Sequence, residues 1–337
     1  MHYGLPVRSH RAPVARRRQL AIVAAGVLAV VAIVVGSVAL TARRPSPSPA
    51  SQAQASTTVE QTQMAVATQA STSTPPTIAA STTAATPART GGTSGKKGVS
   101  TWDFSGVGAA LVDVGVHWYW NWAAVPTKGA GTAAEFVPMI WGPGAVTADT
   151  IARARQNGTT LLGFNEPDFA SQANMSVDQA LDLWPQLQAT GMRLGSPAPA
   201  TGAADAGGWL DRFLSGAAQR GYRVDFIALH WYGSDFSAAA VNQLRGYLQA
   251  VWDRYHLPIW LTEFALIKFT SSGSVYPTDS QQASFINGAT AMLESLSFVE
   301  RYAWFALPTS DSGDATGLYR DGATPTAAGV AYRAAGA

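Results

Sequence analysis

The sequence predicts an α/β fold of the (β/α)8 TIM barrel type in the second part of a 337-residue chain. Short apolar segments that could form strands alternate with segments that could form helices, which is typical of a parallel sheet. Eight expected strands fall within about 240 residues, close to the usual size of such a barrel. An open doubly wound sheet is the alternative, but no glycine-rich phosphate-binding loop follows the first strand.

Each expected strand ends in a polar or aromatic cluster. The strands are expected over residues 98–102, 114–120, 136–141, 160–164, 192–196, 226–231, 259–263 and 301–305. Helices are expected over residues 147–156, 176–190, 208–220, 237–255 and 278–296. Ser176 with Gln179, and Thr278 with Gln281, have the spacing of capping boxes at two helix starts. Pro185 predicts a kink or a break in its helix.

The first part of the chain has a different composition. Residues 1–19 form a basic leader that is expected to be cytoplasmic, and residues 20–42 carry no charge. At about 1.5 Å per residue, the uncharged segment is long enough to cross a bilayer core as a transmembrane or signal-anchor helix. Arg16 to Arg18 precede it and predict a cytoplasmic N-terminus. A cleaved signal peptide ending near Ala39 is the alternative.

Residues 43–95 are rich in Ser, Thr, Pro and Ala, which predicts a disordered stalk that may carry glycans. The catalytic domain is therefore expected over residues 96–337, at the extracellular face of the membrane, or secreted if the leader is cleaved. All eleven tryptophans lie at or after Trp102. We expect this domain to be a monomer.

Charge and cysteine content exclude several kinds of partner. Residues 1–94 hold eight arginines and one glutamate, so the rest of the chain has 15 basic and 20 acidic side chains. An acidic domain offers no electrostatic reason to bind nucleic acid. The chain has no cysteine, which excludes disulfides and thiolate metal sites. His230 has no second histidine or acid at ligand spacing, so we expect no metal and no cofactor.

Two glutamates end apolar strands and form a candidate catalytic pair. Glu166 follows the fourth expected strand and Glu263 ends the seventh. The carboxyl ends of barrel strands carry the chemistry, and aromatic rings among the strand ends could stack on sugars. A glycosidase needs one carboxyl group as acid and another as nucleophile or base. The alternative is that each glutamate only caps a helix or pairs with an arginine.

Six motifs occur in order that resemble one known family. They are "EFVPMIWG", "LLGFNEPD", "LGSPAP", "VDFIALHWYG", "PIWLTEFA" and "VERYAWFAL". Together they are similar to glycoside hydrolase family 128, which contains endo-β-1,3-glucanases of a retaining clan with (β/α)8 barrels. The resemblance covers about residues 96–337. It implies a β-1,3-glucan polysaccharide as substrate.

The resemblance also implies roles for individual residues. Glu166 would be the acid/base, Glu263 the nucleophile, and Asn165 would hold the 2-hydroxyl group of the reacting sugar. His230 and Tyr232 match the family's His-x-Tyr after the sixth strand, where Tyr232 would orient Glu263. From their places at strand ends, the expected aromatic platforms for substrate are Trp141, Trp304 and Trp120. A non-catalytic glucan-binding module, or a barrel glycosidase acting on another linkage, remains an alternative.

Overall fold

The computed structural model describes residues 95–309 and 316–336. The expected leader, the expected membrane segment over residues 20–42 and nearly all of the expected stalk lie outside these residues. In the part of the chain that the structure describes, no helix combines the length and the apolar character needed to cross a bilayer.

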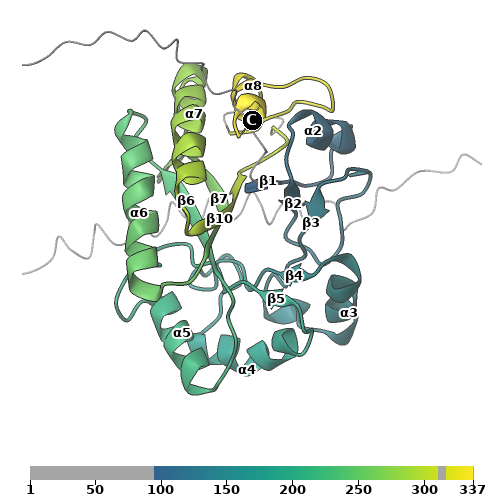
Figure 1. Ribbon diagram of the computed structural model, residues 1–337, viewed down its shortest axis with the longest axis vertical. Helices are drawn as coiled ribbons and strands as arrows, with labels where there is room; N and C mark the ends of the chain where they lie inside the picture. Colours follow the sequence, from purple (N-terminus) through teal and green to yellow (C-terminus); the bar gives the residue numbers. More distant parts are fainter. Residues whose placement is uncertain (1–94, 310–315, 337) are drawn as a thin grey trace, which may run out of the picture.

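The strands pair in parallel and lie inside a surround of helices (Figure 1). One six-stranded sheet has the order β3 (Glu135–Phe136), β2 (Trp118–Trp120), β1 (Lys97–Ser100), β10 (Val299–Trp304), β7 (Ile259–Leu266), β6 (Ile227–Gly233). A second parallel pair joins β4 (Thr160–Leu161) to β5 (Arg193–Leu194). All pairings within the six-stranded sheet are parallel. The predicted α/β class and parallel sheet are therefore confirmed.

Two single bridges connect the strand pair to both edges of the larger sheet. Met139, which follows β3, bridges Leu162, which follows β4, and Gly195 after β5 bridges Phe226 before β6. The parallel pairings thus return to the strand from which they started. Each expected strand overlaps an observed one, but β2 to β5 are shorter than expected. Chain segments there approach closely: a Cβ on Gly163 would lie 2.9 Å from the backbone oxygen of Gly195.

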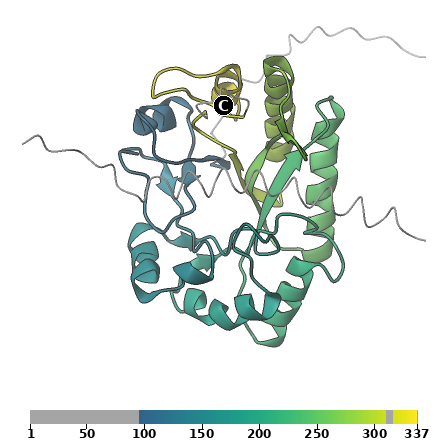
Figure 2. The same cartoon turned by 180° about the vertical axis from the view of Figure 1, so that it is seen from behind.

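The helices cover the outside of the strands, and Figure 2 shows the same arrangement from behind. Their bounds are α2 (Val107–Asp113), the 3-10 helix η1 (Pro143–Ala145), α3 (Ala148–Asn157), α4 (Val177–Gln188), α5 (Trp209–Gln219), α6 (Ala239–Tyr255), α7 (Asp279–Ser295) and α8 (Ala327–Ala334). The hydroxyls of Thr147 and Ser176 cap α3 and α4, and Thr278 forms the full capping box of α7 with Gln281. A break at Pro185 is wrong, because α4 continues through its last turn.

Two helices and one hairpin were not expected from the sequence. The short helix α2 begins after Gly106, which has φ 79° and supplies no side-chain cap. Helix α8 closes the described chain. Strands β8 (Lys268–Thr270) and β9 (Gly273–Val275) form an antiparallel hairpin directly after β7.

The interior has two layers of apolar side chains. A smaller cluster, here called the inner cluster, comes from strand segments alone and fills the ring: Trp118, Trp120, Val137, Met139, Leu162, Phe226, Trp260 and Ala303. A larger cluster packs the outer faces of the strands against the helices. Because successive strand residues point to opposite faces, Ala303 belongs to the inner layer and Trp304 to the outer one. The ring is filled, so polar chemistry is left to the strand ends.

Candidate active site

Glu166 follows β4 in an unusual backbone conformation. Its φ is 42°, in the left-handed region that non-glycine residues rarely adopt. The backbone N–H of Glu166 donates to the oxygen of Ala198 at 2.8 Å, and that of Asn165 donates to the oxygen of Trp141. Pro167 follows immediately and removes one backbone donor. The Glu166 side chain is buried, and this turn aims it at β6 and β7, where its contacts lie.

Glu263 lies within β7 and is held by two donors. The hydroxyl of Tyr232, on β6, donates to Oε2 of Glu263 at 2.5 Å. The indole N–H of Trp122, just beyond β2, donates to Oε1 at 2.9 Å. Glu263 is buried, so these bonds replace the water that a carboxylate would otherwise bind.

His230 lies between the two glutamates. Its Nδ1 is 2.9 Å from Oε1 of Glu166, and its Nε2 is 3.5 Å from Oε1 of Glu263. One ligand atom from each of the three residues lies within 4.8 Å of the others. Retaining glycosidases have carboxyl groups about 5–5.5 Å apart, whereas inverting enzymes need about 6.5–9.5 Å for a water molecule. The pair has the closer, retaining separation.

The buried charges shift one another's protonation. Burial raises the pKa of Glu263, the charge of His230 lowers it, Glu166 raises it, and the bonds from Tyr232 and Trp122 lower it; the net direction is upward. Burial alone would lower the pKa of His230, but the charges of Glu263 and Glu166 raise it above its ordinary value. Burial and the nearby glutamates raise the pKa of Tyr232 well above its usual range. Tyr232 therefore remains a donor.

The structure brings five of the predicted site residues together and gives different surroundings to the others. Asn165 is buried beside Glu166 and donates from Nδ2 to Oε1 of Gln172 at 3.2 Å, not to Glu263. Trp141 is partly buried at the edge of the inner cluster. It is the one predicted platform whose ring keeps part of its surface open.

Two of the expected platforms are wrong. Trp304 is fully buried in the outer layer, where it packs on Phe264, on Phe285 of α7 and on Tyr332 of α8. Its indole N–H donates to the oxygen of Thr316, so no face is left for a sugar. Trp120 is also fully buried, in the inner cluster, and donates to the oxygen of Thr262. It lies beneath the site and supports Trp122 at a ring distance of 4.7 Å.

Sequence reasoning missed the aromatic side of the site. Trp122 has φ 59°, and its ring lies 6.3 Å from that of Trp102 and 5.9 Å from that of Phe305. Phe305 in turn lies 5.6 Å from Tyr232. Trp102, Trp122 and Phe305 are all partly exposed. The signal was the motif "HWYWNW", whose last ring follows the strand end, where alternation no longer predicts direction.

Metal-ligating side chains occur at the same place. Among the described residues, Glu166, His230 and Glu263 form the one group of three that could hold a metal ion. The sequence expectation excluded a metal at His230 because no partner stood at ligand spacing, and the fold supplies two acids from other strands. The same atoms are hydrogen-bonded to one another, to Tyr232 and to Trp122, as acid–base chemistry requires.

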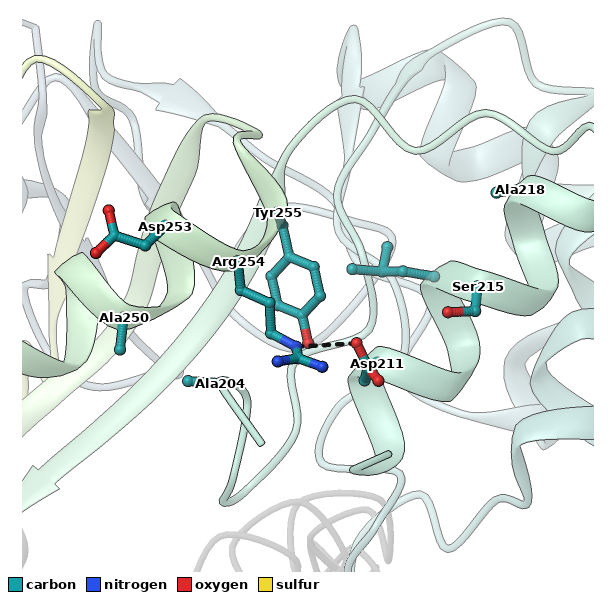
Figure 3. A pocket seen from close by; sticks show the side chains of 9 residues that line it. Ala204, Asp211, Ser215, Ala218, Ala250, Asp253, Arg254 and Tyr255 are labelled. Atoms are coloured by element: carbon teal, nitrogen blue, oxygen red, sulfur yellow. Dashed lines mark hydrogen bonds and ion pairs between the residues drawn. The ribbon is translucent and has the colours of Figure 1, made fainter. Parts of the chain in front are cut away.

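A separate open cavity lies between α5 and α6 (Figure 3). Its volume is about 720 Å³, and Asp211 and Arg254 form an ion pair there at 2.9 Å. The hydroxyl of Tyr255 donates to the oxygen of Ala203. None of the predicted site residues lines this cavity.

The geometry has a counterpart in a known family. The model described as "Glycosyl hydrolase catalytic core" matches residues 107–332 of the chain. The chain belongs to this family. It is a glycoside hydrolase, and the resemblance to glycoside hydrolase family 128 is confirmed by solved structures at 65% identity.

Three similar proteins are informative. A subgroup I endo-β-1,3-glucanase of family 128 from Amycolatopsis mediterranei, solved with laminaritriose, is 65% identical, covers 72% of this chain and 99% of its own, and has a TM-score of 0.68. A curdlan-specific exo-β-1,3-glucanase of subgroup III from Blastomyces gilchristii, solved with glucose, is 31% identical, with coverage of 72% and 99% and a TM-score of 0.57. Alkali-sensitive linkage protein 1 of Schizosaccharomyces pombe is 32% identical over 66% of this chain, which spans only 41% of that protein.

Proposed function

We propose that this glycoside hydrolase cleaves β-1,3-glucan within the chain and retains the anomeric configuration. One observation carries the proposal: Glu166 and Glu263 come from different strands and converge on His230 at the separation of a retaining pair. The glucan substrate is supported by the family 128 relatives, of which one was solved with laminaritriose.

The first step forms a covalent intermediate. Glu166 donates its proton to the glycosidic oxygen, and a carboxylate oxygen of Glu263 attacks the anomeric carbon as the bond to that oxygen breaks. The leaving chain departs with a free hydroxyl group. Tyr232 and Trp122 hold Glu263 in line for the attack, because their donors fix both of its oxygens.

The second step releases the sugar. Glu166, now ionised, takes a proton from water, and the resulting hydroxide attacks the anomeric carbon and displaces Glu263. Two inversions restore the original configuration. His230 contacts both acids, so it acts as a positioning residue whose positive charge favours the ionised form of either glutamate.

The spacing of the two glutamates gives independent support for their roles. The Amycolatopsis mediterranei enzyme was also solved as variants that each lack one of two glutamates. The separation of those two positions along that chain equals the separation of Glu166 and Glu263 here. Asn165 and Trp141 would bind the reacting sugar and its neighbour from the same strand ends.

The arrangement in the cell is a further part of the proposal. The continuous ring of parallel pairings supports a (β/α)8 barrel as the catalytic domain over residues 96–337. The uncharged residues 20–42 would anchor the chain in the membrane with a cytoplasmic N-terminus, and residues 43–95 would act as a stalk. The barrel would then work as a monomer outside the cell.

Exo action is the second candidate, because a 31% identical relative is an exo-β-1,3-glucanase. The purified full-length protein, together with its Glu166→Gln and Glu263→Gln variants, is incubated with laminarin, cellulose and mannan. Mixed laminari-oligosaccharides that appear with the β-anomer first, and that both variants fail to form, support the proposal. Glucose as the only early product favours exo action. Products from cellulose or mannan alone, or glucan binding without products, overturn it.

A further inference from the structure

The amide of Asn165 has one atom paired and one atom open. Its side chain is 3% exposed, and its Nδ2 donates to Oε1 of Gln172 at 3.2 Å. Its Oδ1 is buried and has no hydrogen-bond partner among the described residues. A buried carbonyl oxygen without a partner costs free energy, and such atoms in native proteins usually have a function. Because Asn165 directly precedes Glu166, the open acceptor lies beside the acid/base.

Gln172 is held in place by the segment that follows Glu166. The N–H of Gln172 donates to the oxygen of Phe169 at 3.0 Å, and the N–H of Ala173 donates to the backbone oxygen of Asn165 at 3.2 Å. The N–H of Met175 donates to the oxygen of Pro167 at 2.8 Å. The chain after the strand therefore folds back onto the strand end. Side chain and backbone of this segment both fix Asn165.

We propose that Gln172 is a positioning residue that sets which atom of the Asn165 amide faces the reacting sugar. By accepting one Nδ2 proton, it turns Oδ1 toward the substrate as a hydrogen-bond acceptor. The sugar group that meets this acceptor must be a donor next to the anomeric carbon, which is the 2-hydroxyl group. This inference rests on the proposed function, and it identifies a specificity element outside the catalytic pair.

The proposal makes an unusual demand on position 172. Only an acceptor is needed there, so a carboxylate can replace the amide of Gln172, while an isosteric apolar side chain cannot. If Gln172 instead donated to Asn165, the amide would present Nδ2 to the sugar, and a carboxylate at position 172 would repel Oδ1 of Asn165. Gln172→Glu and Gln172→Leu therefore give opposite results under the two orientations.

The experiment compares two substrates that differ in one hydroxyl group. The full-length protein and its variants are assayed with an aryl β-laminaribioside and with its analogue lacking the 2-hydroxyl group on the reacting sugar. We expect the wild-type kcat/KM to favour the hydroxylated substrate by about 100-fold, since bonds to this hydroxyl strengthen in the transition state. Gln172→Leu should reduce that ratio to about 10-fold or less, mainly by slowing the hydroxylated substrate, and Gln172→Glu should restore it.

The control is Gln156→Leu, a glutamine-to-leucine change at an exposed position of α3. It should leave the ratio and the thermal midpoint unchanged. If Gln172→Leu slows both substrates equally at an unchanged thermal midpoint, Gln172 has only a structural role and the proposal is overturned. If Gln172→Glu loses the ratio as Gln172→Leu does, the amide orientation is the reverse and the proposal is also overturned.

A second measurement does not depend on turnover. If the wild-type protein hydrolyses neither substrate, the proposed function fails, and the hydrogen bond itself is then tested by NMR. The side-chain amide signals of Asn165 are assigned with Asn165→Asp. One Nδ2 proton should exchange slowly in the wild type and in Gln172→Glu, and rapidly in Gln172→Leu. An exchange rate that is the same in all three proteins overturns the inference.

Discussion

Trp122 donates its indole N–H to Oε1 of Glu263 at 2.9 Å while its own backbone lies in the left-handed region. A bulky residue in this region is strained, and such strain persists where the surroundings fix it, often at functional sites. The rings of Trp120, Trp102 and Phe305 surround Trp122 and supply this constraint. The donor is thus fixed by packing.

Trp122→Phe keeps a ring but removes this donor. Because the bond lowers the pKa of Glu263, its loss should raise that pKa further, and the acid limb of the pH profile of kcat/KM should move to higher pH. A bond to a charged group is worth about 1.5–3 kcal/mol, so kcat should fall about 10- to 100-fold. Trp102→Phe is the control, because Trp102 belongs to the same aromatic group and has no bond to Glu263. An unmoved acid limb contradicts this role.

His230→Gln should affect both glutamates. The pKa of His230 is raised by its two acidic neighbours, so the wild-type imidazole stays charged to higher pH than an ordinary histidine. Removing the charge leaves Glu263 with burial and Glu166 as unopposed upward influences on its pKa. We expect kcat/KM to fall about 100-fold and the acid limb to shift up by about one pH unit. Asp168 also acts on His230 by its charge, so Asp168→Asn should move the profile less. A lower maximum with an unchanged pH profile would instead mean that His230 only fills space.

Trp304 and Trp141 should separate stability from binding. Trp304→Ala removes a fully buried ring from between β10 and the helices α7 and α8. It should destabilise the domain by about 3–5 kcal/mol, measured by denaturant unfolding. Trp141→Ala removes a partly exposed ring and should raise KM for laminarin several-fold with a smaller loss of stability. The reverse pattern would return Trp304 to the site.

Lys97 should make stability rise with pH. Burial lowers the pKa of Lys97 to about 8, although Glu294 opposes this. Its Nζ donates to the backbone oxygens of Arg333 and Ala335, beside α8. The unfolded chain binds the proton more tightly, so the free energy of unfolding increases as pH rises from about 8 toward the unfolded value. From pH 7 to 9.5, the gain should be about 2 kcal/mol. Lys97→Met should lack most of this slope; an equal slope in both proteins would contradict the prediction.

The fold was predictable where local pattern and topology agree. Apolar runs that stop at polar clusters marked all eight ring strands, and the hydroxyls of Thr147 and Thr278 marked helix starts that the structure contains. The helix α2 was missed because Gly106 gives no capping signal. The hairpin β8–β9 was missed because its two strands are short and half exposed, without a strong apolar alternation.

The site was predictable in its acids and less so in its rings. Glu166 and Glu263 end or interrupt apolar runs, which places a carboxylate at a strand end without further information. The direction of a ring depends on the phase of its strand, and sequence does not give that phase where every residue is apolar. Ala303 and Trp304 are adjacent, and only the fold shows which of them faces inward. Gln172 and His230 gained their partners through contacts between distant segments.

The two halves of the site rest on backbone of unequal stiffness. Glu263, His230 and Tyr232 lie on β6 and β7, which pair along their whole length. Glu166 lies beyond the two-residue ladder of β4 and β5, where single bridges join the neighbours. Amide hydrogens should exchange slowly on the first side and faster on the second. The nucleophile then has a rigid mount with a fixed line of approach, while the residue that must serve first as acid and then as base sits where the chain can adjust between the two steps.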